Sequence, residues 1–209
     1  QPLQGLYAAS PGSPSVTNSL ARIAYREGDR AKARQLVKQI LELAPERLTG
    51  RDKSGALLTG ARLALEVDEE AALAGLEQAI KAWPSNIEAL DLLSERHFQT
   101  KNYDQALEQL EELVAAKVVN PQIDIKIALC HEALRRPERA VSHLEKAIKK
   151  WPDDPSLPTA LGRVHLNQRA FDKAQKALES ALLVEPTWEA ALLAISDLFV
   201  RQAQVDTAI

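Results

Sequence analysis

Two stretches of the chain, PERAVSHLEKAIKKWP at residues 137–152 and FDKAQKALESALLVEP at residues 171–186, decide the fold. Each stretch places alanine, leucine, alanine and proline at the same four positions, and the two begin 34 residues apart. Within each stretch the apolar residues recur at steps of three and four, which puts them on one face of an α-helix. The pattern therefore predicts a chain built from repeated amphipathic helices.

The same phases recur through most of the chain. One phase holds Ala72, Ala106, Ala140 and Ala174, the phase four residues later holds Leu76, Leu110, Leu144 and Leu178, and Pro84, Pro152 and Pro186 close their units. A small residue lets two helix backbones approach closely, and a proline ends a helix because it has no amide hydrogen to donate. Alanine, leucine, glutamate, lysine and arginine, all strong helix formers, dominate the composition. The sequence thus predicts an all-α fold of antiparallel helix pairs joined by short polar turns.

Five complete units and two partial units fit this period. The complete units span 14–47, 53–86, 87–120, 121–154 and 155–188, and the partial units span 1–13 and 189–209. First helices are expected near 15–27, 53–66, 87–99, 121–133 and 155–167. Second helices are expected near 30–43, 69–82, 103–116, 137–150 and 171–184. Residues 48–52 fall between the first two units and are expected to form a longer loop.

The pattern resembles the 34-residue tetratricopeptide repeat, in which a large apolar residue, a small residue, an aromatic, alanine, an apolar residue, alanine and proline recur. The resemblance covers nearly the whole chain, and five consecutive units keep one phase. It implies one domain over residues 1–209, a right-handed superhelical solenoid of antiparallel helix pairs that binds other proteins. Neither end shows the polar outer face of a terminal repeat, so we expect a fragment of a longer bacterial array.

Composition and motifs argue against several other functions. The net charge is −3 and charges of both signs are mixed along the chain, which does not fit a nucleic-acid binder. No apolar run approaches the roughly 18 residues that a membrane-spanning helix needs. Phosphate-binding loops, metal-spaced Cys/His clusters and nucleophile turns are missing from the sequence, so we expect no enzyme, no cofactor and no metal site. The one cysteine, Cys130, stands in an apolar run and is interpreted as a small core residue.

Two sets of residues could be interpreted as ligand sites. His97, His131 and His165 share one phase and could form a metal ladder. Adjacent helices lie about 8–10 Å apart, however, whereas zinc ligands lie about 2 Å from one ion. Packing at the aromatic phase of the repeat is therefore the favoured interpretation. Trp83 and Trp151 precede the closing prolines and are interpreted as apolar plugs at the unit ends, with stacking on a ligand as the alternative.

The resemblance also implies where a partner binds, because in this family the first helices line a concave groove. The groove-facing phases give Asn18, Arg22, Arg26, Leu57, Ala61, Leu65, Asp91, Glu95, Phe98, Ile125, Leu129, Glu132, Arg163 and Asn167. Leu57 and Leu129 are expected to be apolar anchors, with Arg22 and Arg163 facing acidic flanks of the partner. The alternative is that the apolar residues only pack on the next unit.

We therefore expect a non-enzymatic scaffold that binds another protein or peptide, with no nucleic-acid partner and no membrane insertion. The regular units resemble arrays in bacterial envelope assemblies, including those for exopolysaccharide export; a cytoplasmic location is the alternative. A second hypothesis is a regulatory or docking domain of a larger enzyme. Family members that hold chaperone C-terminal tails use a clamp of Lys, Asn and Arg. Leu58 and Glu88 occupy two of the matching positions here, so a chaperone tail is not expected.

Overall fold

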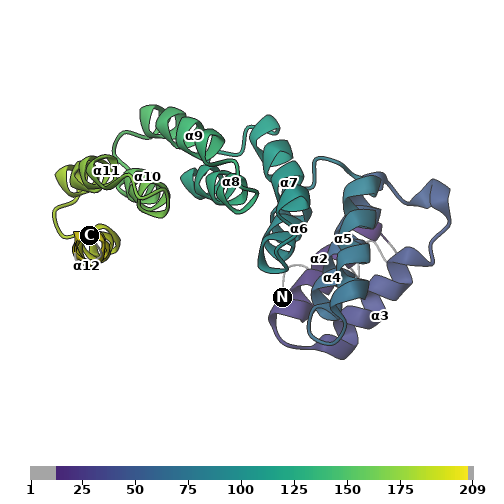
Figure 1. Cartoon of the computed structure of the whole chain (residues 1–209). Helices are drawn as coiled ribbons and strands as arrows, with labels where there is room; N and C mark the ends of the chain where they lie inside the picture. The colour runs from purple at the N-terminus through teal and green to yellow at the C-terminus, as the bar shows by residue number, and fades with distance from the viewer. Residues whose placement is uncertain (1–12, 207–209) are drawn as a thin grey trace. The chain divides into compact units, whose positions relative to one another are not determined.

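The computed structural model describes residues 13–206, and every regular element in that range is a helix (Figure 1). The α-helices are α2 (Pro14–Arg26), α3 (Arg30–Leu41), α4 (Gly50–Ala64), α5 (Glu69–Ala82), α6 (Ile87–Gln99), α7 (Tyr103–Ala115), α8 (Pro121–Ala133), α9 (Pro137–Lys150), α10 (Ser156–Asn167), α11 (Phe171–Val184) and α12 (Glu189–Asp206). A short 3-10 helix, η1, spans Pro45–Arg47. The ten helices predicted for the five complete units agree with α2–α11 to within three residues at every end. The predicted partial unit 1–13 lies outside the described residues except for Ser13.

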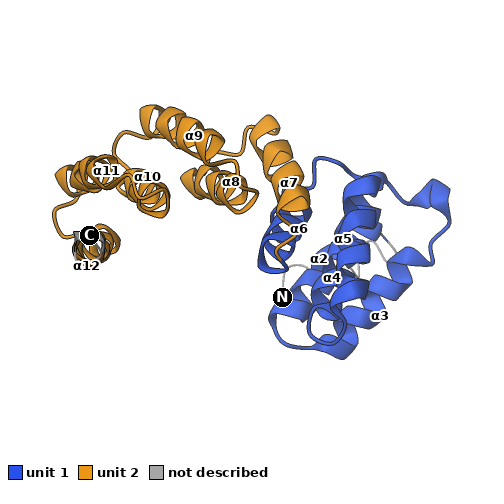
Figure 2. Cartoon of the chain, viewed as in Figure 1, with its two compact units in different colours: residues 1–100 blue, residues 101–209 orange. Residues whose placement is uncertain are grey.

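The chain divides into two compact units, residues 1–100 and 101–209 (Figure 2). In unit 1, α2 packs against α3 and α4 against α5, so each first helix contacts its own second helix. α2 also contacts α4, and α5 contacts α6. In unit 2 the same relation pairs α8 with α9 and α10 with α11, while α8, α10 and α12 follow one another as neighbouring first helices. The prediction of one domain over 1–209 stays a prediction.

The core lies where the repeat phases predict it. Ala72, Ala106, Ala140, Ala174, Leu76, Leu110, Leu144 and Leu178 are all 0% exposed. In unit 2, Gly162 shows how close the packing is, because a Cβ built there would lie 2.6 Å from Cγ and Cδ2 of Leu178. The alanine and leucine of each second helix therefore form the contact that the sequence pattern predicts.

Four of the turns between paired helices use a left-handed residue. Gly28, Lys101, Arg135 and Arg169 have φ between 58° and 85°. At Arg135 the amide of the next residue, Arg136, donates to the carbonyl of His131 at 2.8 Å, which closes the end of α8. Lys101, Arg135 and Arg169 follow one another at the repeat period, so this turn is part of the repeat.

The expected loop at residues 48–52 is partly wrong, because α4 begins at Gly50. The hydroxyl of Thr49 accepts a hydrogen bond from the amide of Asp52 at 3.1 Å and caps the helix. A side chain at position 50 would collide with the carbonyl oxygen of Ala82, so glycine lets the start of α4 approach the end of α5. The cap extends α4 by one turn beyond the prediction, and that turn forms part of the site described next.

Candidate partner-binding grooves

A hollow of about 610 Å³ lies over the first helices of unit 1. Its walls come from α2, from the start of α4 and from the junction that leads into α6. The lining residues are Ser15, Asn18, Ser19, Arg22, Thr49, Arg51, Asp52, Gly55, Leu58, Trp83, Ser85, Asn86, Ile87 and Glu88. We call this hollow the unit 1 groove. It combines two arginines, two carboxylates, several hydroxyl and amide groups, and a small apolar surface.

Asn18 joins the first two helices of this groove. Its Nδ2 donates to the main-chain oxygen of Asp52 at 2.7 Å, which ties α2 to the first turn of α4. A Cβ built at Gly55 would lie 3.3 Å from the same Nδ2, so a larger residue would press on the Asn18 amide. The floor between α2 and α4 is therefore set by one side-chain hydrogen bond and one close approach.

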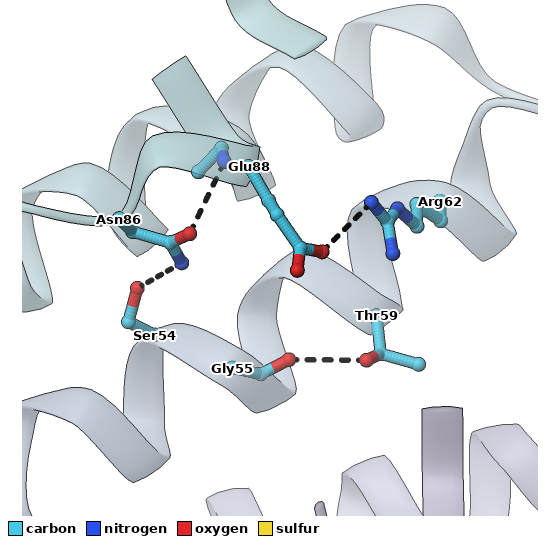
Figure 3. A network of polar contacts seen from close by, with 7 residues as sticks. Ser54, Gly55, Thr59, Arg62, Asn86 and Glu88 are labelled. Carbon is cyan, nitrogen blue, oxygen red and sulfur yellow. Dashed lines mark hydrogen bonds and ion pairs between the residues drawn. The ribbon is translucent and has the colours of Figure 1, made fainter. Parts of the chain in front are cut away.

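A buried polar network fixes the wall formed by the start of α6 (Figure 3). The hydroxyl of Ser54 donates to the carbonyl oxygen of Ala79 at 2.6 Å, and Nδ2 of Asn86 donates to that hydroxyl oxygen at 2.7 Å. Oδ1 of Asn86 accepts from the amide of Ala89 at 3.2 Å and caps α6. Ser54 and Asn86 are 0% and 5% exposed. Since a buried polar group costs stability unless it is hydrogen-bonded, this network holds α4, α5 and α6 in one arrangement.

Both carboxylates of the groove already have partners. Oε2 of Glu88 lies 3.0 Å from a guanidinium nitrogen of Arg62, as Figure 3 shows. The carboxylate of Asp52 accepts from the hydroxyl of Thr49 in the cap of α4.

The two arginines of the groove do not pair with carboxylates. Arg22 is exposed, and Arg51 places its guanidinium 5.1 Å from the ring centroid of Trp83. Among residues 13–204, whose side chains are described, no carboxylate lies within ion-pair distance of either arginine. Their donors are available to a ligand, so the groove can receive an anionic group.

The predicted groove residues of unit 1 fall into two sets. Asn18 and Arg22 line the groove, while Arg26 is exposed on the last turn of α2 outside it. On α4, Ala61 is only 2% exposed and Leu57 packs against the same core cluster. Ala61 offers a partner almost no surface because it packs closely against α5. A Cβ built at Gly75 of α5 would lie 3.2 Å from the Cβ of Ala61.

The groove face of α4 is instead Arg51, Asp52, Gly55 and Leu58. Leu65 is the half-buried C-cap of α4 and does not line the groove. Asp91, Glu95 and Phe98 lie further along α6, also outside the lining. The cap signal Thr-Gly-Arg-Asp at residues 49–52 could have located the groove turn of α4 from sequence.

A smaller hollow of about 280 Å³ lies between α10 and α12 in unit 2. It is lined by Arg163, Leu166, Asn167, Leu193, Ala194, Asp197 and Arg201. Nδ2 of Asn167 donates to Glu132 on α8 at 2.7 Å, and Arg201 donates to Oδ1 of Asn167 at 3.3 Å. The structure thus brings Glu132, Arg163 and Asn167 together. Ile125 packs against the core cluster of α8–α10, and Leu129 is half-buried outside this hollow.

A third hollow lies on the second-helix side of unit 1, between α3 and the α4–α5 turn, with a volume of about 810 Å³. Val37, Leu41, Leu63 and Val67 make it largely apolar. Leu41 is 39% exposed and Val67 is 76% exposed. This hollow is the alternative to the unit 1 groove as a binding site for a partner.

The histidines and the cysteine lie in the core. His97, His131 and His165 are between 5% and 8% exposed, which agrees with the packing interpretation. Burial lowers the pKa of His131, and electrostatic interactions with the nearby His143 and Arg139 act in the same direction. Cys130 is 0% exposed, and burial raises the pKa of its thiol to about 11.

Within residues 13–206, no group of three or more His, Cys, Asp or Glu side chains is arranged to hold a metal ion. None of the described helices is both long enough and apolar enough to cross a bilayer.

Asp124 is a buried acid that the sequence analysis did not single out. Its side chain is 9% exposed and lies between α8 and α9. Oδ1 lies 3.0 Å from Nε2 of His143, Oδ2 accepts from Nε1 of Trp151 at 3.2 Å, and Nζ of Lys150 lies 3.7 Å away. Three donors around one carboxylate make it a clamp between the paired helices. An acid among apolar residues, as in Ile-Asp-Ile at 123–125, is the signal that could have found it.

Comparison with known proteins places these helix pairs in a described family. Two family models, both described as tetratricopeptide repeat, match residues 92–155 and 133–198. No curated protein sequence matches the chain significantly.

Solved structures share the fold along most of the chain. YrrB, described as a tetratricopeptide protein with an unusual peptide-binding site, is 15% identical with a TM-score of 0.74; the match covers 94% of this chain and 98% of that one. MamA is 18% identical with a TM-score of 0.68, over 85% of this chain and 96% of that one. The C-terminal part of a repeat protein from Cytophaga hutchinsonii is 12% identical with a TM-score of 0.69, over 87% and 71%. At these identities the likeness is one of fold.

Proposed function

Since this chain belongs to the tetratricopeptide repeat family, we propose that it is a non-enzymatic scaffold that holds a segment of a partner protein in the unit 1 groove. The observation that carries the proposal is the charge arrangement in that groove. Arg22 and Arg51 lack carboxylate partners among the described residues, while Asp52 and Glu88 are already engaged. A partner that supplies an acidic group completes this arrangement.

The groove fits one acidic residue next to an apolar one. Arg51 lies over the ring of Trp83, so the ring restricts where the guanidinium can point. A carboxylate that pairs with this guanidinium forms charge-assisted hydrogen bonds, the strongest class available to a peptide. Beside it, Ile87 is 45% exposed and offers apolar surface together with Trp83. Trp83 therefore contributes to a ligand surface as well as closing its unit.

A run of several acids fits less well than a single one. Glu88 keeps a negative charge on the same wall, and its side chain is 51% exposed even while it pairs with Arg62. A second ligand carboxylate near Glu88 would meet like charge, which lowers affinity. This supports the expectation that chaperone C-terminal tails are not the partner.

The comparison with YrrB supports peptide binding as a use of this fold, since that protein is described as having a peptide-binding site. The unit 2 hollow with Arg163 is a second candidate contact, at less than half the volume of the unit 1 groove. A setting in the bacterial envelope and a role as docking domain of a larger enzyme both stay predictions, because either use is compatible with the same groove.

The proposal can be tested by selecting random dodecapeptides displayed on phage against the protein. We expect enriched peptides to carry Asp or Glu adjacent to an apolar residue. Enriched peptides should lose about tenfold or more in affinity for Arg51→Glu, since a hydrogen bond to a charged group contributes about 1.5–3 kcal/mol. Arg47→Glu is the matched control, because Arg47 is an exposed arginine outside the groove.

Two results would contradict the proposal. One is enrichment of peptides with no acidic preference. The other is selected peptides that bind Arg51→Glu as tightly as wild type but lose affinity for Val67→Glu, which would move the site to the second-helix side.

A further inference from the structure

The hollow on the second-helix side of unit 1 exists because two residues are smaller than their repeat equivalents. We call it the α3 hollow; its apolar part is Val37, Leu41, Leu63 and Val67. Val37 stands at the phase where the other four complete units carry leucine. A Cβ built at Gly60 would therefore meet Val37 at an ordinary 3.5 Å, whereas the equivalent Cβ at Gly162 would collide with a leucine. On α5, Ala71 stands at a phase that holds long polar residues elsewhere, Lys32, Gln105, Arg139 and Lys173.

Val67 puts an aliphatic side chain on the rim of this hollow, at the turn between α4 and α5. It is 76% exposed. The same phase is exposed in the other four complete units, where it holds Gly28, Lys101, Arg135 and Arg169. The repeat therefore leaves this position open everywhere, and an aliphatic residue occupies it in one unit alone.

The end of α11 carries a second unusual pair of aliphatic residues. Leu183 is 86% exposed and Val184 is 41% exposed, and we call the two the α11 ridge. The phase of Leu183 is also exposed in the other four complete units, where it holds Glu42, Lys81, Ala115 and Lys149. Glu42 and Lys149 stay exposed although the helix pair that follows each of them is in place. The exposure of Leu183 is thus a property of its phase and does not depend on which helices follow α11.

The free charges beside these two surfaces are of opposite sign. At the α3 hollow, Lys38 lies 3.7 Å from Glu42, and Asp68 caps α5. Arg34 is exposed, and among residues 13–204 no carboxylate lies within ion-pair distance of it. Next to the α11 ridge, Glu185 is exposed and, within the same range, has no cation at that distance. A free cation at the hollow and a free anion at the ridge are complementary.

We propose that the α3 hollow of one molecule receives the α11 ridge of a second copy of this chain, with Glu185 of one copy facing Arg34 of the other. A second copy is favoured over an unrelated partner because this one chain supplies both halves of the contact, the apolar surfaces and the matching charges. The hollow lies in unit 1 and the ridge in unit 2. The contact is therefore heterologous, and copies associate head to tail into an open chain or a ring. The proposal does not depend on the unit 1 groove.

Sedimentation velocity over a concentration series tests this contact on the whole chain. The average mass of the wild-type protein should rise with concentration. Leu183→Ala should raise the dissociation constant about tenfold or more, because it removes the largest apolar side chain of the ridge. Val67→Glu should do the same, because it places a charge in the hollow that repels Glu185. Val119→Glu is the matched control and should associate as wild type, since Val119 is 73% exposed and lies outside both surfaces.

An equimolar mixture of Leu183→Ala and Val67→Glu tests whether the two surfaces meet each other. Each variant alone should be monomeric at a concentration where the wild-type protein associates, and circular dichroism melting checks that both are folded. The first variant keeps an intact hollow and the second an intact ridge, so the mixture should form a one-to-one dimer and nothing larger. Arg34→Glu and Glu185→Arg should each weaken association, and the two together should restore it.

Four results would overturn the proposal. Wild-type protein that stays monomeric at about 1 mM would exclude even a contact with a millimolar dissociation constant. Unchanged association of either Leu183→Ala or Val67→Glu would place the contact elsewhere. A mixture of these two variants that stays monomeric would show that the hollow and the ridge do not bind each other. Display-selected peptides that lose affinity for Val67→Glu would assign the hollow to a different polypeptide.

Discussion

Nε2 of His143 lies 3.0 Å from Oδ1 of Asp124, and this contact joins the second helix α9 to its first helix α8. The same carboxylate accepts from the indole of Trp151 at the end of α9. A buried acid with these partners holds the pair at two points more than one helical turn apart. Packing of apolar residues holds the two helices together, and Asp124 restricts how they can slide along each other.

We expect Asp124→Ala to destabilise the α8–α9 pair by about 2–3 kcal/mol, because it leaves the indole N–H without its acceptor and removes hydrogen bonds to a charged group. Hydrogen exchange of residues 121–150 measures the loss locally, as repeat proteins open in parts. Asp153→Ala, at an exposed aspartate just after α9, is the control. Equal protection in the two variants would show that the clamp contributes nothing.

Gly60 and Gly162 occupy one repeat phase but should respond in opposite ways to alanine. A Cβ at Gly162 would lie 2.6 Å from the buried Leu178, so Gly162→Ala should cost about 1–3 kcal/mol through overpacking. A Cβ at Gly60 would lie 3.5 Å from Cγ1 of Val37, an ordinary contact, so Gly60→Ala should stabilise by up to about 1 kcal/mol. Urea midpoints measure both changes. A shift of the same sign in both variants would contradict the packing described here.

Arg135 adopts φ of 60° at the end of α8, a conformation that costs a residue with a side chain about 1–2 kcal/mol. Glycine at this position removes that cost, but part of the gain in stability is offset because glycine also makes the unfolded chain more flexible. Arg135→Gly should therefore raise stability by about 0.5–1 kcal/mol in urea unfolding. Arg139→Gly, at an exposed position inside α9, should instead lose about 1 kcal/mol. If Arg135→Gly destabilises the protein as much as Arg139→Gly does, the left-handed turn carries no strain.

His131 should make unit 2 sensitive to acid. Burial lowers the pKa of the folded imidazole below its ordinary value of 6.5, so the unfolded chain binds a proton more readily than the folded one. The stabilising contribution is present above about pH 6.5 and is lost as the pH falls below it. His131→Phe should therefore reduce the difference in urea midpoint between about pH 7.5 and about pH 5.5. An unchanged difference would assign the acid sensitivity to other groups.

The helices could be predicted from sequence because each unit repeats the same apolar positions of its second helix, as Ala140 and Leu144 illustrate. These positions pack only within their own unit and against the neighbouring unit, so their burial follows from the repeat itself. The start of α4 was harder to predict, because it depends on the cap between Thr49 and Asp52, and these residues lie outside the 34-residue period. Because that cap adds a turn, the groove face of α4 is Arg51, Gly55 and Leu58.

The polar contacts of the site were the least predictable part. Arg22 and Arg163 could be placed in hollows by phase alone. The pairing of Arg62 with Glu88, and the lack of a carboxylate partner for Arg51 among the described residues, depend on side-chain positions that no period determines. The clamp at Asp124 is of the same kind. Spacing in sequence predicts which face a residue occupies, and it does not predict which of several nearby charges it meets.

The central claim is that Arg51 and its groove bind an acidic residue of a partner, and a double-mutant cycle tests it most directly. A display-selected peptide and its Asp→Lys or Glu→Lys form are each titrated against the wild-type protein and Arg51→Glu. We predict that each single change weakens binding about tenfold or more, and that the two changes together restore much of the affinity, with a coupling of at least about 1 kcal/mol. Losses that simply add would contradict direct pairing and with it the proposed groove.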